Sequence, residues 1–203
     1  MGRLFSQPAL SLCYVIMREQ HPNTLEKIGT GLVCSVETFR GCNIQLTKKT
    51  SGFNGLSTNR DGEVRKIEVK SMEKSFSWIA ISSLIAIDKL FFERDYWIYF
   101  VLIPQNYVVM AKGLPFITQQ LAFSSNEEFI QNIRVWMKAT RKLTRESGLK
   151  FLPKLQLKFP VPLNKLVEHL IQNPDDKTWH DSVIEIWQNQ SAWTCLYAAP
   201  EEE

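Results

Sequence analysis

The sequence predicts an α/β domain with a mixed central sheet flanked by helices and a small C-terminal helical appendage. Segments with helical periodicity alternate with short β-prone runs, which is typical of a layered α/β domain. The chain has 203 residues, 44% hydrophobic and 22% charged, which suits one globular core. No window reaches the roughly 18 uninterrupted apolar residues of a membrane span, so no membrane association is expected.

The first part of the chain predicts a helix, a strand and a hairpin. Residues 23–40 carry apolar side chains at helical spacing, with Asn23 or Thr24 as N-cap and Gly41 just past the end. NIQLT, residues 43–47, predicts a short strand. The stretch GFNGLSTNRDGEVRKIEVKS, residues 52–71, predicts two strands joined by a tight turn, because Asp-Gly between β-prone runs is a strong hairpin signal.

The remaining chain alternates strands and helices. Strands are expected over 75–82, 95–103 and 107–113, and the apolar and aromatic run 95–103 predicts a strand covered on both faces. Helices are expected over 82–94 and, as a long element, 124–147. The proline-containing stretch 152–164 predicts a linker, and two short helices over 164–172 and 176–188 close the chain.

The charge distribution is uneven although the net charge is only +3. Residues 134–158 hold eight basic residues and one acid, whereas 164–203 hold two basic and eight acidic residues. On the long predicted helix a basic stripe at i, i+3, i+4 and i+7 could contact successive phosphates of DNA, and a solvated helix face would explain it equally well. The stripe consists of Lys138, Arg141, Lys142 and Arg145.

The cysteines and histidines predict neither zinc nor disulfides. The four cysteines form no C-x-x-C pair, and the three histidines lack metal-ligand spacing. We expect reduced thiols in a cytoplasmic protein. The N-terminus has no convincing charged region or cleavage site, so no signal peptide is expected.

The strand EVRKIEVKS is the stretch that could carry chemistry. Lys66, Glu68 and Lys70 share one face, while Ile67 and Val69 share the other. A carboxylate between two amines suits a divalent metal with a phosphate: the Glu68 carboxylate and the Val69 carbonyl can bind Mg²⁺ or Mn²⁺. Lys70 could then offset phosphate charge and Lys66 could contact DNA. An exposed edge strand with solubilising ion pairs is the simpler alternative.

GFNGLSTNRDGEVRKIEVKS followed by DYWIYFVLI resembles the core of the PD-(D/E)XK, restriction-endonuclease-like nuclease superfamily, especially the branch typified by the C-terminal domain of the plant NO VEIN protein. The resemblance covers about residues 23–113. It implies that Glu68 is a metal ligand and Lys70 the catalytic amine. The aspartate of the family falls on Asn54, and its helix glutamate is best matched by Glu37, with Glu26 on the same helix.

The chain is expected to divide into three parts. Residues 1–115 would form the nuclease-like core, 116–150 a long basic helix packed on it, and 151–203 the proline linker and C-terminal helices. On the last predicted helix, an apolar stripe would pack on its own domain or dock a second copy or a partner protein. That stripe consists of Trp179, Val183, Ile186 and Trp187.

Asn54 leaves three explanations open. The chain could be a degenerate nuclease, Asn54 could be a variant that traps an inactive form, or the pair Asn54–Gly55 could deamidate to an acid. The function expected from the resemblance is a Mg²⁺-dependent DNA endonuclease of prokaryotic defence or DNA processing. The alternatives are an inactive nuclease-fold module that binds DNA or a partner protein, and an unrelated α/β domain with a chance hairpin.

Overall fold

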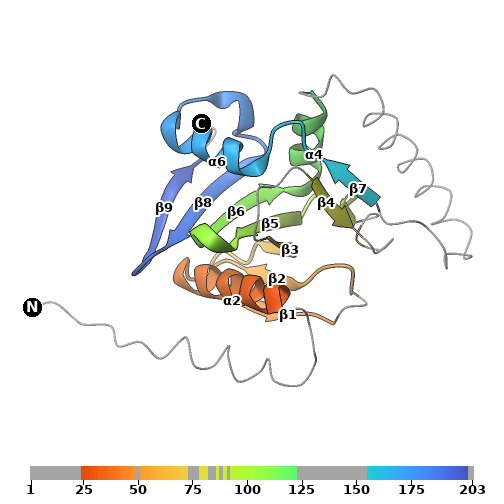
Figure 1. The fold of residues 1–203 in the computed structure, drawn as a ribbon. Coiled ribbons are helices and arrows are strands. Elements are labelled where there is room, and N and C mark those ends of the chain that lie inside the picture. The colour runs from red at the N-terminus through yellow and green to blue at the C-terminus, as the bar shows by residue number, and fades with distance from the viewer. Residues whose placement is uncertain are drawn as a thin grey trace, which may run out of the picture.

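A computed structural model of the chain describes residues 24–48, 51–72, 78–81, 86, 89–90, 92–122 and 155–200. At its centre lies a seven-stranded sheet (Figure 1). Across the sheet the strands follow the order β1 (Asn43–Leu46), β2 (Gly55–Thr58), β3 (Val64–Met72), β5 (Tyr96–Leu102), β6 (Tyr107–Lys112), β8 (Val183–Asn189) and β9 (Trp193–Ala198). β3 and β5 are parallel and the other neighbours antiparallel, so the prediction of a mixed sheet is confirmed.

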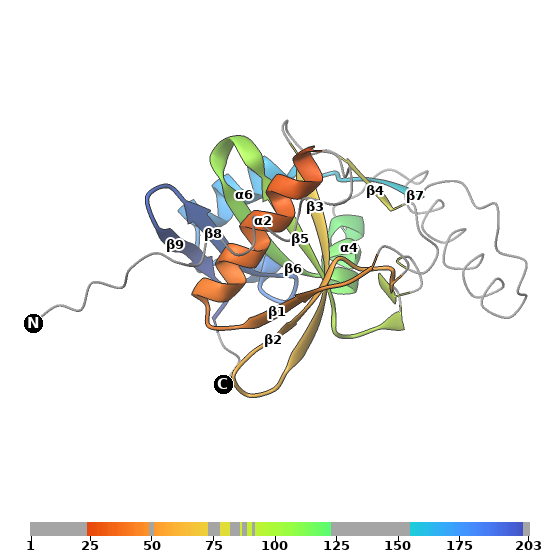
Figure 2. The same ribbon diagram turned by 90° about the horizontal axis from the view of Figure 1, so that it is seen from below.

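Helices cover both faces of this sheet. α2 (Thr24–Phe39) crosses one face, over β3, β5 and β6 (Figure 2). α4 (Gly113–Ala122) and α6 (Leu163–Gln172) lie on the opposite face (Figure 1). Every residue of β5 is buried, as expected for a strand covered on both sides.

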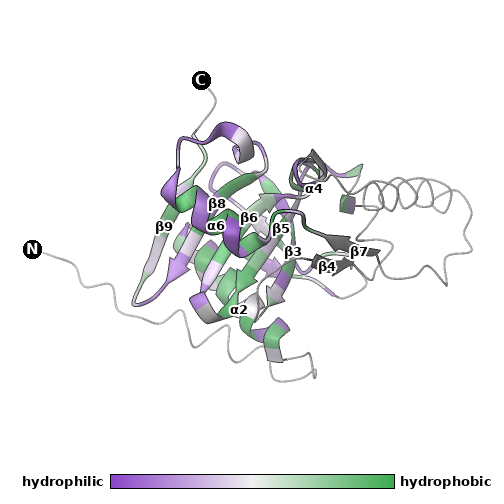
Figure 3. Cartoon of the chain, turned by 45° about the horizontal axis from the view of Figure 1, so that its top comes forward, coloured by the Kyte–Doolittle hydropathy of each residue, from purple (hydrophilic) through white to green (hydrophobic). Residues whose placement is uncertain are grey.

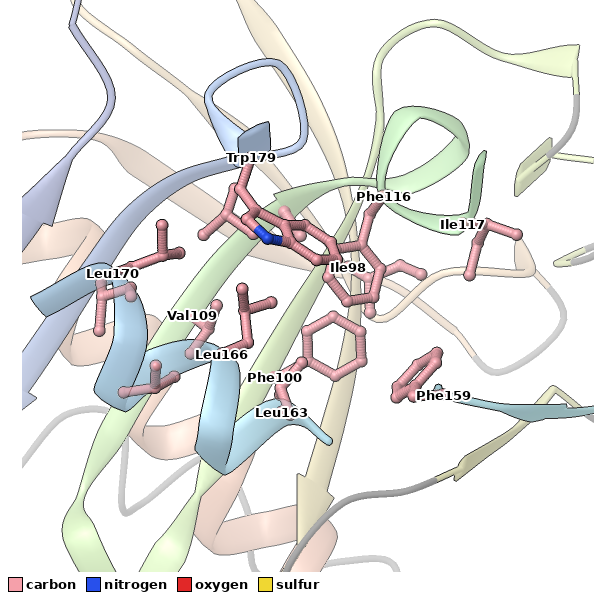
Figure 4. Close-up of a cluster of buried hydrophobic side chains, with 14 of the residues drawn as sticks. Ile98, Phe100, Val109, Phe116, Ile117, Phe159, Leu163, Leu166, Leu170 and Trp179 are labelled. Carbon is pink, nitrogen blue, oxygen red and sulfur yellow. The ribbon is translucent and has the colours of Figure 1, made fainter. Parts of the chain in front are cut away.

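Two apolar clusters hold the layers together. On the α2 side, Val33 and Val36 pack against alternate residues of the strands, including Ile67, Val69 and Tyr99. The larger cluster lies under α4 and α6, where aromatic rings meet edge to face (Figure 4). Its labelled members include Phe100, Phe116, Phe159, Leu166 and Trp179. The hydropathy of the chain agrees with a buried sheet. The central strands are mainly apolar, whereas the outer side of α6 is polar (Figure 3).

The predicted hairpin forms as expected. β2 pairs with β3 from Gly55 opposite Ile67 to Thr58 opposite Val64. In the turn, the Asn59 Oδ1 atom accepts hydrogen bonds from the backbone N–H of Asp61 at 3.0 Å and of Glu63 at 2.8 Å. Gly62 has a φ of +85°, a conformation that glycine adopts without steric cost.

The prediction of a helix over 176–188 is wrong. A 3₁₀ turn, η4 (Lys177–Trp179), leads into β8, which pairs with β6 and with β9. Val183 and Ile186 are buried in the core beneath α6, so the apolar stripe is no helical docking face. Among the described residues of the C-terminal region, only α6 fits the predicted helical appendage, and the hairpin after it extends the main sheet.

A second, two-stranded sheet lies beside the main one. β4 (Trp78–Ile81) pairs with β7 (Leu155–Lys158), so the strand expected over 75–82 is present and the stretch expected as a linker contains a strand. The long helix expected over 124–147 lies outside the described residues. In the part of the chain that the structure describes, no helix is both long and apolar enough to cross a membrane.

Candidate functional site

The structure brings Asn54, Glu68 and Lys70 together where β2 begins beside β3. Asn54 directly precedes β2, and its backbone N–H donates to the Ile67 carbonyl at 2.8 Å. Its side-chain Oδ1 accepts a hydrogen bond from the backbone N–H of Val69 at 2.7 Å. The amide of Asn54 therefore lies against the peptide that joins Glu68 to Val69.

Glu68 and Lys70 form an ion pair on the face of β3 opposite α2. Lys70 Nζ lies 2.7 Å from Glu68 Oε1, and the two side chains are only 20% and 13% exposed. In the parallel pairing with β5, Glu68 lies opposite Ile98 and Lys70 opposite Phe100. The ion pair therefore lies beside the larger apolar cluster, where its charges are poorly solvated.

The surroundings of Glu68 favour its neutral form. Burial raises the pKa of the Glu68 carboxyl, Lys70 lowers it, the nearby Glu26 carboxylate raises it, and the net direction is upward. Burial also raises the pKa of Tyr96, with further upward contributions from Glu68 and Glu93. Lys70 therefore stabilises the negative charge of Glu68, whereas burial and the Glu26 carboxylate both disfavour that charge.

The segment before β2 is fixed by contacts that sequence reasoning missed. The Tyr96 hydroxyl donates to the Gly52 carbonyl at 3.2 Å, and the Thr47 hydroxyl donates to the Phe53 carbonyl at 2.5 Å. The Thr47 N–H donates to the Asn54 carbonyl at 2.9 Å. The backbone of Asn54 is therefore held by hydrogen bonds to residues on both sides of it in the sheet. No local sequence pattern indicates a contact such as that of Tyr96 with Gly52, which lies 44 residues away.

Lys66, expected to contact DNA, is engaged elsewhere. Its Nζ atom lies 2.7 Å from Glu93 and 3.0 Å from Asp95, and Glu93 also pairs with Lys89 at 2.9 Å. Those carboxylates neutralise Lys66, so we do not retain it as a phosphate contact. The four cations of the predicted basic stripe, Lys138, Arg141, Lys142 and Arg145, lie outside the described residues.

Glu37, expected as a metal ligand, belongs to a separate buried network. Its fully buried carboxylate accepts from Tyr99 at 3.0 Å, from Arg40 at 2.8 Å and from Ser57. Arg40 also pairs with Glu185 at 2.5 Å. Glu37 is thus occupied in the interior, and the acid of α2 that acts on Glu68 is Glu26, in the first turn.

The donor atoms at this site can be compared with what Mg²⁺ needs. Glu68 offers one carboxylate, and the Val69 carbonyl points to the same side as its N–H, toward Asn54. However, the Val69 N–H requires an acceptor, so the Asn54 oxygen must face it and the amide NH₂ group faces outward. Among the described residues, no three His, Cys, Asp or Glu side chains gather into a group that could hold a metal. With Asn54 in place, these residues do not fit Mg²⁺.

Comparisons of the chain with protein-family models, with curated proteins and with solved structures find no match. Function is therefore inferred from the residues of the site themselves.

Proposed function

We propose that this chain is a nucleic-acid-binding protein of the PD-(D/E)XK nuclease type, which contacts the phosphodiester backbone of DNA at Asn54, Glu68 and Lys70. The observation that carries the proposal is the convergence of these residues at the end of one hairpin, with the Glu68–Lys70 pair at 2.7 Å. A role in prokaryotic defence or DNA processing, in the cytoplasm, is part of the same proposal.

The chemistry of the site supports a phosphate as ligand. Lys70 supplies an ammonium group and Asn54 an amide, and both are suited to donate to phosphate oxygens. Because Lys70 is only 20% exposed, its charge is weakly screened by water and salt. A phosphate that reaches it would be bound more firmly than at an exposed lysine.

Mg²⁺- or Mn²⁺-dependent endonuclease activity is the second candidate function. The charge of Glu26, which acts on Glu68, favours this candidate, because additional carboxylates suit a cation site. The missing feature is a charge at position 54. One charge pair about 4 Å apart contributes roughly 4 kcal/mol at an effective dielectric near 20, or about a thousandfold in cation affinity. Asn54→Asp should supply that charge with almost no change of shape.

A combined binding and cleavage experiment tests both candidates. The unchanged protein, Asn54→Asp, and Asn54→Asp with Lys70→Ala are compared on single- and double-stranded DNA with Mg²⁺ and with Mn²⁺. We expect binding without cleavage from the unchanged protein, and cleavage from Asn54→Asp that is lost when Lys70→Ala is added. Cleavage by the unchanged protein would favour the second candidate, and failure of all three to bind DNA would refute the first.

A further inference from the structure

We propose that the site takes a phosphate group directly, without a divalent cation, on the Lys70 ammonium and the Asn54 amide NH₂. The phosphate would take the place on Lys70 that the Glu68 carboxylate now holds. This inference rests on the proposed function, because it names how the nucleic-acid backbone is held at the same three residues.

The first support is the orientation of Asn54. Its Oδ1 atom accepts from the Val69 N–H at 2.7 Å, which leaves the NH₂ group as the side-chain donor that can face a ligand. Rotating the amide would leave the Val69 N–H without its acceptor, a costly loss for a buried backbone group. The backbone of Asn54 is also held at both ends, by the Ile67 carbonyl and by the Thr47 N–H. Position 54 therefore presents a hydrogen-bond donor, which attracts phosphate oxygens and repels cations.

The second support is the Glu68–Lys70 pair. An ammonium group has three donors, and Glu68 accepts from Lys70 through a contact of 2.7 Å. Burial and Glu26 both oppose the negative charge on Glu68. A phosphate that reaches Lys70 would take the place of the Glu68 carboxylate on the ammonium group. Glu68 would then compete with the ligand for Lys70.

This arrangement reverses the expected effect of changing Glu68. In a site where a cation bridges protein and phosphate, Glu68 holds the cation, so Glu68→Gln should weaken binding. In a cation-free site, Glu68→Gln removes a negative charge that competes for Lys70, so binding should tighten. The two mechanisms therefore predict opposite signs for one nearly isosteric substitution.

The test is fluorescence anisotropy of a short fluorescein-labelled oligothymidylate with the full chain, in EDTA and in MgCl₂ at matched ionic strength. Glu68→Gln should tighten binding about fivefold or more in EDTA, the effect of removing one nearby like charge. Lys70→Ala should weaken it roughly tenfold or more, as expected for a lost charge-assisted hydrogen bond. Asn54→Asp should weaken binding in EDTA, because a donor becomes an anion.

Matched controls come from the exposed pair Lys165–Glu168 on α6. Lys165→Ala and Glu168→Gln change the net charge by the same amounts as Lys70→Ala and Glu68→Gln, away from the site. Circular dichroism melts establish that each variant is folded. Inorganic phosphate should displace the probe better than chloride at equal ionic strength, and equal displacement would contradict specific phosphate recognition.

The outcomes separate this inference from the proposed function. Weaker binding by Glu68→Gln, together with loss of binding by the unchanged protein in EDTA, would overturn the cation-free inference and leave DNA binding intact. Site variants that bind no differently from the α6 controls would also overturn it, because DNA would then bind elsewhere on the protein. If no protein bound DNA under any condition, the proposed function itself would fail.

Discussion

Gly29 lies where α2 touches β3, and Gly29→Ala measures how closely the helix and the strand pack. A Cβ atom at this position would lie 1.6 Å from Ser71 Oγ and 2.7 Å from Ser71 Cβ. Both distances are far below the roughly 3.5–4 Å of ordinary carbon contacts. Although alanine favours a helix by about 1 kcal/mol over glycine, overpacking typically costs about 1–3 kcal/mol and should prevail. Because the overlap is severe, the upper part of that range applies, and we expect a net destabilisation of about 1–2 kcal/mol.

Changes at Ser71 show whether that contact causes the loss. The Ser71 hydroxyl is buried without a hydrogen-bond partner among the described residues, so Ser71→Ala alone should be neutral or stabilising. Ser71→Ala keeps the Cβ atom of residue 71, which would still lie 2.7 Å from a Cβ atom at position 29. Gly29→Ala should therefore remain destabilising when residue 71 is alanine. In a Ser71→Gly background the nearest remaining neighbour is Val101 Cβ at 3.6 Å, an ordinary contact, so the steric cost should vanish.

Urea unfolding of the four combinations of Gly29→Ala and Ser71→Gly provides the measurement. A coupling free energy of about 1–3 kcal/mol, with opposite sign to the cost of Gly29→Ala, is expected for residues in direct contact. An equal cost of Gly29→Ala with Ser71 and with Gly at position 71 would refute the described packing. Because Glu26 lies on the same helix, that result would also remove the basis for placing Glu26 near Glu68.

Three further substitutions address the buried charges and the core. Arg40→Met should destabilise the fold by about 3–5 kcal/mol in urea, because Glu37 and Glu185 lose their cation; a cost near zero would contradict the network. Glu68→Gln should gain stability over the unchanged protein as the pH rises. Because the pKa of Glu68 is raised in the folded state, protonated Glu68 contributes its full share of folding stability below pH 4.5, the ordinary pKa of the group. That contribution is lost as the pH rises through the folded-state pKa. A difference in melting temperature between the two proteins that stays constant across pH would argue against this. Phe159→Ala should cost about 3–5 kcal/mol by thermal unfolding, since Phe159 is 4% exposed and contacts two other rings; a loss below about 1 kcal/mol would mean that the ring is not packed as described.

The elements that sequence reasoning predicted correctly depend on local signals. The hairpin follows from Asp61–Gly62 between β-prone runs, and its register alone brings Asn54 beside Val69. The helix expected over 176–188 was predicted from the helical spacing of four apolar residues, Trp179, Val183, Ile186 and Trp187. In the structure Trp179 belongs to a 3₁₀ turn, and an extra residue in β8 between Val183 and Glu185 places Val183 and Ile186 in the same apolar cluster. Trp187 instead packs against the cluster on the α2 side.

The parts of the site that sequence reasoning did not predict depend on distant contacts. Glu26 and Glu37 lie on one helix, and which of them is near Glu68 depends on how α2 crosses the sheet. Lys66 shares the strand pattern of Glu68, yet its partner Asp95 lies 29 residues away. Neither outcome follows from periodicity, because both are set by tertiary packing.

The contacts between α2 and the C-terminal hairpin have a consequence for synthesis on the ribosome. Ser35 accepts from the Trp193 indole across 158 positions, and Arg40 binds Glu185 across 145. A nascent chain that has emerged only as far as β6 would present that strand as an open edge and leave Arg40 without Glu185. The sheet can therefore be completed only after translation has passed Ala198, the end of β9. Until then the unpaired strand edge exposes the emerging chain to aggregation.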